Sequence, residues 1–381
     1  MVDESVAPRI PGGKVMTQRS PISYPDYLKL ETLLACQQPE SEKQGRPAHD
    51  ELLFIIVHQA YELWFKQILF ELDHVQRLFA GPKVDDRALG SVVHALLRIV
   101  EIERLIIQQL SVLETMTPLD FMDFRDLLVP ASGSQSLQFR LIETRLGLRS
   151  RDRIALAGRS PEAYLTSADR EKLETAQSAA SISDQVEQWL ERTPFIDRGS
   201  YKFRDAYRRT IEEMLESDAA LVRANPRLRD EEKQAELANL TAARQRFDGL
   251  FDEVAHKKLV EDGVWRLSSR ALQAALFINL YRDEPVLQLP FRLLNLLMDV
   301  DELLTTWRYR HALMVQRMIG LKVGTGGSSG HDYLRQTAES HRAFRDLFAL
   351  STFLIPRSRL SALPPELMRA MGYRYADEGN P

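Results

Sequence analysis

The 381-residue sequence has little of several features that mark particular classes of protein. Cys36 is its only cysteine, which excludes an intrachain disulfide and a zinc cluster built on several thiolates and favours a reducing compartment. With a formal net charge of -4, the chain has no overall basic field that could hold a phosphate backbone. We therefore expect no nucleic-acid partner.

Long apolar runs are also missing. The longest, from Leu52 to Phe65, is interrupted by His58, Gln59 and Glu62. It falls short of the roughly 20 apolar residues that cross a bilayer. Residues 1–20 lack the apolar core of a secretory signal and are predicted to form a flexible tail. We expect a cytoplasmic protein with no membrane partner.

Several catalytic motifs are absent as well. The sequence has no Gly-x-Ser-x-Gly elbow and no His-Glu-x-x-His pair, which argues against hydrolase and metalloprotease chemistry. A glycine-rich stretch at 324–330 follows a helical pattern and lacks the strand and lysine of a phosphate-binding loop. Its composition favours a lid, in which Thr325 offers a hydroxyl to a ligand.

What the sequence does contain is helical periodicity. Apolar residues recur at three- and four-residue steps from Asp50 to about Phe79, including Ile56 and Val57, and again from about Asp86 to Leu113. Pro118 is predicted to open a further helix at its first turn. Sustained strand alternation and hairpin turns are not found. The fold class is therefore predicted to be all-α.

The domain organisation follows from the same survey. With 381 residues and 44% hydrophobic content, the chain can bury a sizeable core as one large domain or two smaller ones. We predict that residues 21–381 form a single all-α domain. A charged helical excursion at about 150–260 is expected to pack on the main body. Apolar helices return at 270–282 and 290–320, with breaks at Pro285 and Pro290.

His58 is the first candidate for chemistry. It lies in an apolar stretch, and Phe54 lies four residues earlier on the same helical face, so an imidazole and an aromatic ring could line one pocket. The alternative is a core histidine whose ring is satisfied by a backbone carbonyl, which spacing alone favours.

His311 is the second candidate. It continues a helical stripe that contains Leu304 and Trp307 and runs on to Met314 and Met318. Imidazole on such a face can serve as the proximal ligand of a haem iron, with the apolar wall burying the porphyrin. A packed core histidine is the commoner reason for this pattern.

Arg125 is the third candidate, in a segment that also contains Phe121 and Phe124. A guanidinium beside aromatic rings could hold a substrate carboxylate through two parallel hydrogen bonds. An internal ion pair with Asp126 or Glu114 is an equally good interpretation of the local sequence.

A set of ordered motifs extends these observations. It comprises Tyr24-Pro-Asp-Tyr-Leu28, His49-Asp-Glu-Leu-Leu-Phe-Ile-Ile-Val-His-Gln59, Glu62-Leu-Trp64, Leu113-Glu-Thr-Met-Thr-Pro118, Phe124-Arg-Asp126, Pro130-Ala-Ser-Gly133, Gln135-Ser-Leu-Gln-Phe139, Trp307-Arg-Tyr-Arg-His311 and Gly324-Thr-Gly-Gly-Ser-Ser-Gly330. Together they resemble the tryptophan 2,3-dioxygenase family, from about Tyr24 to Pro356.

The resemblance implies an all-α, tetrameric enzyme, a dimer of dimers in which long helices enclose one b-type haem per subunit. The implied reaction is the cleavage by O2 of the indole C2–C3 bond of L-tryptophan, which gives N-formyl-L-kynurenine as the first step of tryptophan catabolism. Because both oxygen atoms enter the product, no stoichiometric reductant is consumed.

The resemblance also implies roles for single residues. His311 would be the proximal iron ligand, and Trp307 would contact the haem. Ser132 would line the pocket at the haem edge. His58 would lie near the indole nitrogen.

The remaining implied roles concern the substrate. Phe54 and Phe121 would pack against the indole, Arg125 would bind the carboxylate, and Thr325 would contact the ammonium group. Tyr24 and Tyr27 would reach the site from a neighbouring subunit.

Two positions depart from the family pattern. Ser134 stands where phenylalanine is usual and Val129 where a small residue is common, so either could reshape the pocket wall. A related haem oxygenase of secondary metabolism that acts on a substituted tryptophan is the first alternative. The second is a non-enzymatic haem sensor, although a sensor would not need Phe54, His58, Arg125 and Thr325 together.

Overall fold

The computed structural model describes residues 21–81, 83–154, 161–320, 322 and 330–372. Helix accounts for 75% of the structure and strand for 1%, which confirms the predicted all-α class. The predicted flexible tail at 1–20 and the glycine-rich stretch at 324–329 lie outside the described residues.

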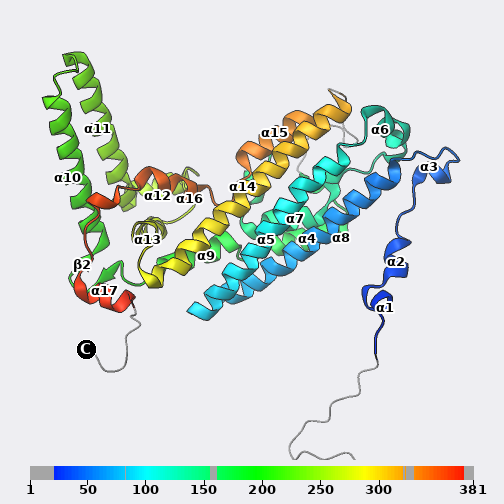
Figure 1. Ribbon diagram of the computed structural model, residues 1–381, viewed down its shortest axis with the longest axis horizontal. Helices are drawn as coiled ribbons and strands as arrows, with labels where there is room; N and C mark the ends of the chain where they lie inside the picture. The colour runs from blue at the N-terminus through cyan, green and yellow to red at the C-terminus, as the bar shows by residue number, and fades with distance from the viewer. Residues whose placement is uncertain (1–20, 82, 155–160, 321, 323–329, 373–381) are drawn as a thin grey trace, which may run out of the picture.

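Three long helices form the centre of the molecule. They are α4 (Glu51–Phe79), α5 (Asp86–Leu113) and α14 (Pro285–Ile319), and they lie side by side (Figure 1). Helix α14 packs most extensively against α5, and α15 (Gly330–Ser340) lies along α14. The predicted bounds of the first two helices match the structure closely.

The spacing of buried side chains explains why α4 packs as it does. Seven of its apolar residues are buried at steps of three and four positions: Val57, Tyr61, Phe65, Ile68, Leu72, Val75 and Phe79. Fully burying one such side chain contributes about 1.5–3 kcal/mol. Ile56, which the sequence placed on the buried stripe, is instead 47% exposed, because it lies about 100° around the helix from Val57.

Prolines mark helix starts here. Thr117 accepts a hydrogen bond from the backbone N–H of Asp120, the Asp120 carboxylate accepts one from Thr117, and Pro118 opens α6 (Pro118–Arg125) as predicted. Pro285 opens α14 in the same way, but Pro290 does not interrupt that helix, so the predicted break was wrong. One missing N–H near the start of a 35-residue helix is outweighed by its long buried face.

A second set of helices covers the long ones. Helices α7 (Leu137–Leu146) and α9 (Ile182–Glu191) pack on α4, α8 (Ser167–Ser178) packs on α7, and α13 (Ser269–Leu280) packs on α9 and α14. The other short elements are η1 (Asp126–Leu128), η2 (Gly133–Gln135), η3 (Ser150–Asp152), η4 (Pro161–Tyr164), α12 (Glu253–Glu261), α16 (Arg345–Ala349), η5 (Leu350–Phe353), η6 (Arg357–Arg359) and α17 (Pro365–Met371).

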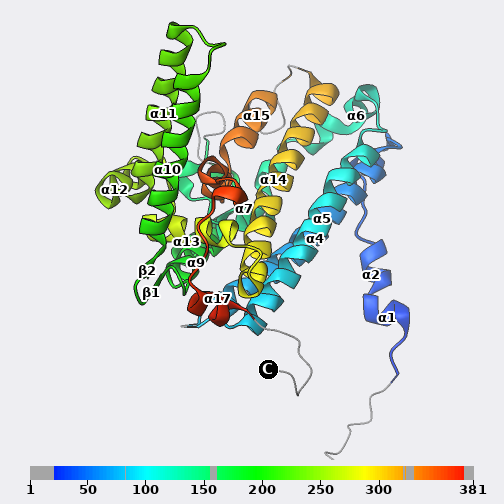
Figure 2. The same ribbon diagram turned by 60° about the vertical axis from the view of Figure 1, so that its left-hand side comes forward.

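The charged region at about 150–260 is not uniform. Helices α8 and α9 belong to the main body, whereas α10 (Phe203–Ala224) and α11 (Asp230–Phe251) pair with each other and project from one end (Figure 2). A two-stranded hairpin, β1 (Asp197–Arg198) and β2 (Tyr201–Lys202), precedes them. Strands of two residues are too short to produce the alternation by which strands are predicted.

The N-terminal helices extend from the opposite end. α1 (Tyr24–Leu28) and α2 (Leu30–Leu34) contain no buried residue, and both views show them away from the long helices (Figures 1 and 2). The short α3 (Glu40–Lys43) connects them to α4. No helix in the described part of the chain is both long and apolar enough to span a membrane.

Candidate active site

A cavity of about 330 Å³ lies among α4, α5, α6, α7, α14 and α15, a size within the range of ligand pockets. Most of its wall is apolar. The aliphatic and thioether part of the wall is formed by Leu110, Leu113, Met116, Met314, Val315, Met318 and Ile319. Such a wall favours an apolar occupant over water.

The structure brings most of the predicted site residues to this cavity. Those that border it are Phe54, His58, Phe121, Arg125, Ser132, Trp307 and His311. Tyr24 and Tyr27 do not, since they lie on α1 and are 72% and 71% exposed within the single chain. Thr325 lies outside the described residues.

His58 borders the cavity with a defined tautomer. Its Nδ1 lies 2.7 Å from the carbonyl oxygen of Phe54, one helical turn earlier. A carbonyl oxygen only accepts, so Nδ1 carries the proton, and the Nε2 of the neutral ring is left as an acceptor. Burial lowers the pKa of His58 and keeps the ring neutral, despite the opposing effects of this hydrogen bond and of Glu62. The carbonyl contact expected of a core histidine is therefore present, and the ring, which borders the cavity, has no proton on Nε2.

The Phe54 ring stacks obliquely beside His58, with centroids 4.1 Å apart and an interplanar angle of 35°. Phe121 approaches Phe54 with a centroid distance of 5.7 Å. Phe124 is fully buried behind them, 5.5 Å from Phe54. These rings form an aromatic wall against which an indole could pack.

His311 belongs to α14 and is separated from His58 by 253 residues in the sequence. Its ring stacks on Trp307 with centroids 5.1 Å apart and an interplanar angle of 3°. Burial, with a smaller contribution from His58, lowers the pKa of His311 to about 4, so the ring is neutral at physiological pH. Nδ1 of His311 is buried and has no hydrogen-bond partner among the described residues.

Arg125 ends α6 at the cavity, and its side chain is 17% exposed. The nearest Asp126 oxygen lies 3.8 Å from Nη1, and the Asp126 side chain itself is 90% exposed. Glu114, the other predicted ion-pair partner, binds Arg310 at 3.2 Å instead. The guanidinium therefore borders the cavity beside a weak, solvent-screened contact with Asp126.

The two positions that depart from the family pattern differ in location. Ser134 borders the cavity beside Ser132 and Gly133, as expected of a residue that shapes the wall. Val129 is 58% exposed and is not among the residues that border the cavity. Only the first departure therefore changes the wall.

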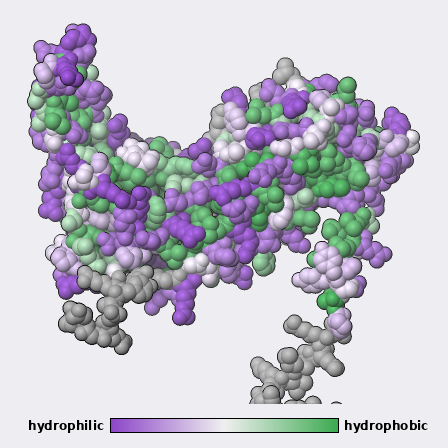
Figure 3. Space-filling model, in the orientation of Figure 1, coloured by the Kyte–Doolittle hydropathy of each residue, from purple (hydrophilic) through white to green (hydrophobic). Residues whose placement is uncertain are grey.

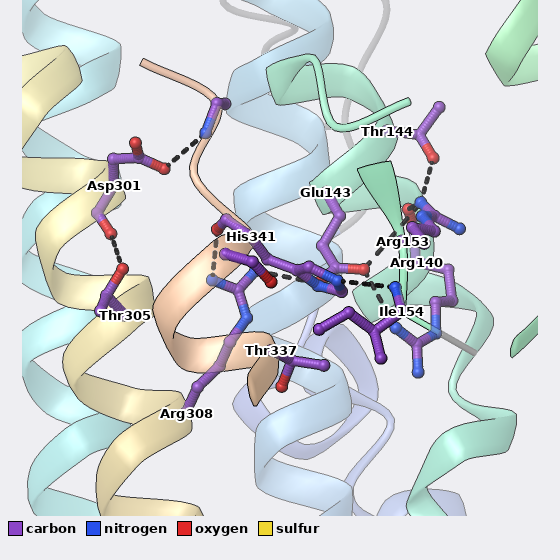
Figure 4. Close-up of polar contacts among 12 residues, drawn as sticks. Arg140, Glu143, Thr144, Arg153, Ile154, Asp301, Thr305, Arg308, Thr337 and His341 are labelled. Carbon is purple, nitrogen blue, oxygen red and sulfur yellow. Dashed lines mark hydrogen bonds and ion pairs between the residues drawn. The ribbon is translucent and has the colours of Figure 1, made fainter. Parts of the chain in front are cut away.

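Arg140, Glu143, Arg308 and His341, which border the cavity, belong to a buried ionic cluster whose contacts are drawn in Figure 4. The Glu143 carboxylate accepts hydrogen bonds from Arg308 at 2.8 Å and Arg140 at 3.1 Å, and Arg153 lies 3.9 Å away. Burial alone would raise the pKa of Glu143, but Arg140, His341 and the other arginines hold it well below its usual range. Glu143 therefore remains ionised.

His341 completes this cluster. Its Nε2 accepts a hydrogen bond from the backbone N–H of Ile154 at 3.2 Å, so Nδ1 carries the proton and faces Glu143 at 3.5 Å. Arg308 also donates to the His341 carbonyl oxygen at 3.0 Å. The cluster thereby connects α7, α14 and the end of α15 around the cavity.

Sequence reasoning did not identify this cluster. Arg140 and Glu143 lie three residues apart on α7, a spacing that indicates a pair on one helix face. Nothing local in the sequence indicates that Arg308 and His341 join them, because those contacts span 165 and 33 residues.

Comparison with known proteins agrees with this geometry. Residues 10–354 match the family model described as tryptophan 2,3-dioxygenase. The tryptophan 2,3-dioxygenase of Bdellovibrio bacteriovorus is 52% identical over 93% of this chain and 99% of its own. Those of Alteromonas mediterranea and Dictyostelium discoideum are 47% and 44% identical, again over 93% of this chain, and over 98% and 89% of their own.

The structure is that of an all-α protein with an apolar cavity bordered by a histidine from each of two long helices, His58 on α4 and His311 on α14. The family-model match covers nearly the whole chain. The chain belongs to the tryptophan 2,3-dioxygenase family.

Proposed function

We propose that this protein is a haem-dependent dioxygenase that cleaves the indole C2–C3 bond of L-tryptophan with O2 and releases N-formyl-L-kynurenine. The observation that supports it best is the convergence of His58, Phe54, Arg125 and His311 on one apolar cavity. This set matches the three parts of the reaction, which are an iron ligand, an indole site and a carboxylate site. Nothing favours a substituted tryptophan or a sensor role.

The residues that border the cavity are of the kinds that would hold a b-type haem. His311 is neutral and buried beside Trp307, and its Nδ1 has no hydrogen-bond partner among the described residues. A neutral imidazole with an unsatisfied ring nitrogen suits the role of an axial iron ligand. Within the ionic cluster, Arg140 and Arg308 border the cavity and suit the carboxylates of the porphyrin. When bound, one haem per subunit would supply the activation of O2.

The protein's own residues would orient the substrate. Arg125 would bind the carboxylate, and the Phe54 and Phe121 rings would pack against the indole. The bare Nε2 of His58 would accept the indole N–H and hold that proton at a fixed position. We further propose that Thr325 contacts the ammonium group. Fixing the substrate by these contacts and excluding water lower the entropic part of the barrier.

We also propose a homotetramer, a dimer of dimers in the cytoplasm. Helix α4 exposes Leu52, Ile56, Leu63 and Phe70, separated by four, seven and seven residues and thus on one face. Hydrophobic side chains gather over α4, α5 and the N-terminal helices in Figure 3. Tyr24 and Tyr27 project from the chain and would reach the cavity of a neighbouring subunit.

The proposed function is tested by purifying the protein after expression with a haem precursor. We expect a Soret band that moves when CO is added to the reduced protein, and formation of N-formyl-L-kynurenine from L-tryptophan. A protein that binds no haem, or that binds haem but leaves tryptophan intact, would contradict the proposal.

A further inference from the structure

The cavity wall between α6 and α7 carries two serines whose hydroxyls are bonded to each other. The Ser134 hydroxyl donates to Oγ of Ser132 at 3.0 Å, and the backbone N–H of Ser134 lies 3.3 Å from the same oxygen. The backbone N–H of Ser132 donates to the Gln135 side chain at 3.1 Å, which fixes the residue. Both serines border the cavity.

This arrangement decides what the Ser132 hydroxyl can do. A serine oxygen has two lone pairs and one proton. Because Ser134 occupies both lone pairs, the O–H of Ser132 is left only to donate. Ser132 therefore cannot accept a hydrogen bond from an ammonium or an indole N–H, but it can donate to an oxygen.

The flanking residues indicate which oxygen. Arg125 precedes Ser132 by seven residues, Arg140 follows it by eight, and all three border the same cavity. Guanidinium groups only donate. Although Glu143 accepts a hydrogen bond from Arg140, the three arginines that border the cavity (Arg125, Arg140 and Arg308) outnumber its two glutamates (Glu62 and Glu143), so the wall offers donors and net positive charge. A carboxylate is the group that matches both properties.

We propose that Ser134 is a positioning residue that orients Ser132 to donate a hydrogen bond to a carboxylate oxygen inside the cavity. This inference rests on the proposed function, which supplies two sources of such a carboxylate, the amino-acid substrate and the haem. Ser134 acts through Ser132 and need not touch either ligand.

The test compares Ser134→Ala, Ser134→Thr and Ser132→Ala with the double variant, all as haem-loaded protein. If the substrate carboxylate is the acceptor, Ser134→Ala raises KM for L-tryptophan about two- to tenfold, the usual effect of losing one hydrogen bond. Oxidation of tryptamine, which lacks the carboxylate, then stays unchanged. If a haem carboxylate is the acceptor, both KM values stay and the rate of haem transfer to apomyoglobin rises by a similar factor.

Two further comparisons show whether the effect passes through Ser132. Ser134→Thr, which keeps a hydroxyl, should restore the wild-type values, and Ser134→Ala should add nothing in the Ser132→Ala background. The proposal would be overturned if Ser134→Ala had the same effect in the wild-type and Ser132→Ala backgrounds. It would also be overturned if Ser134→Ala changed neither KM nor the rate of haem transfer. Failure of the proposed function is distinct, because the wild-type protein would then lack haem or tryptophan cleavage.

Discussion

Replacement of Arg125 by leucine tests the proposed contact between its guanidinium and the substrate carboxylate. The Arg125 side chain is 17% exposed, and its Nη1 lies 3.8 Å from Asp126, whose side chain is 90% exposed. A hydrogen bond to a charged group contributes about 1.5–3 kcal/mol. Since about 1.4 kcal/mol corresponds to a factor of ten, kcat/KM for L-tryptophan should fall roughly ten- to hundredfold in Arg125→Leu.

The assay is a double difference with L-tryptophan and tryptamine on both proteins at equal haem content. Tryptamine lacks the carboxylate, so it should be a poor substrate of the wild type and should lose much less on the substitution. Arg77→Leu is the matched control, because Arg77 is an exposed guanidinium in the last turn of α4 and does not border the cavity. Equal proportional losses for the two substrates would mean that Arg125 supports the fold or the haem instead.

Three more predictions follow from the histidines and the N-terminal helices. His311→Ala should give folded protein with little haem, measured by the haem-to-protein absorbance ratio, and normal haem content with unchanged ligand spectra would refute the axial role. In the haem-free protein, the unfolded chain binds a proton at His311 near pH 6.5, whereas the folded chain does so only near the depressed pKa of about 4. Stability to urea should therefore fall as the pH is lowered from 6.5 to about 4, and His311 should account for at most roughly 3 kcal/mol of this loss. The stability of His311→Leu should depend less on pH. If the variant and the wild type showed the same pH dependence, the buried, neutral state of His311 would be contradicted. Deletion of residues 1–28, which removes Tyr24 and Tyr27, should raise KM for tryptophan and weaken assembly, as measured by size exclusion, while leaving the haem spectra intact. Unaltered kinetics in a stable tetramer would show that the segment is only a tail.

The parts of the fold that sequence predicts well are those with strong local signals. The apolar spacing of α4 predicts that helix almost to the residue, and Pro118 marks the start of α6, because periodicity and helix-start signals act within a few positions. Pro290 misled the prediction, since a local penalty was outweighed by burial along the rest of α14. The projection of α10 and α11 depends on tertiary packing, which charge content does not encode.

The candidate site likewise divides into residues that local sequence identifies and residues that only the folded structure brings together. Single-residue reasoning found His58, His311 and Arg125 but could not choose between core and ligand roles, and only the motif set placed them in one site. Ser134 was noted as a departure, yet its bond to Ser132 depends on the backbone of a short 3₁₀ turn. The Glu143 cluster was missed because its partners are far apart in sequence.

The most direct test of the central claim is the fate of oxygen during turnover. The reduced, haem-loaded protein would be supplied with L-tryptophan under ¹⁸O₂, and the product would be analysed by mass spectrometry at short times. The proposed reaction predicts N-formyl-L-kynurenine in which both new oxygen atoms are labelled. A product with one labelled atom, or an oxidised tryptophan whose indole ring is still closed, would contradict the assignment of this chain as a tryptophan-cleaving dioxygenase.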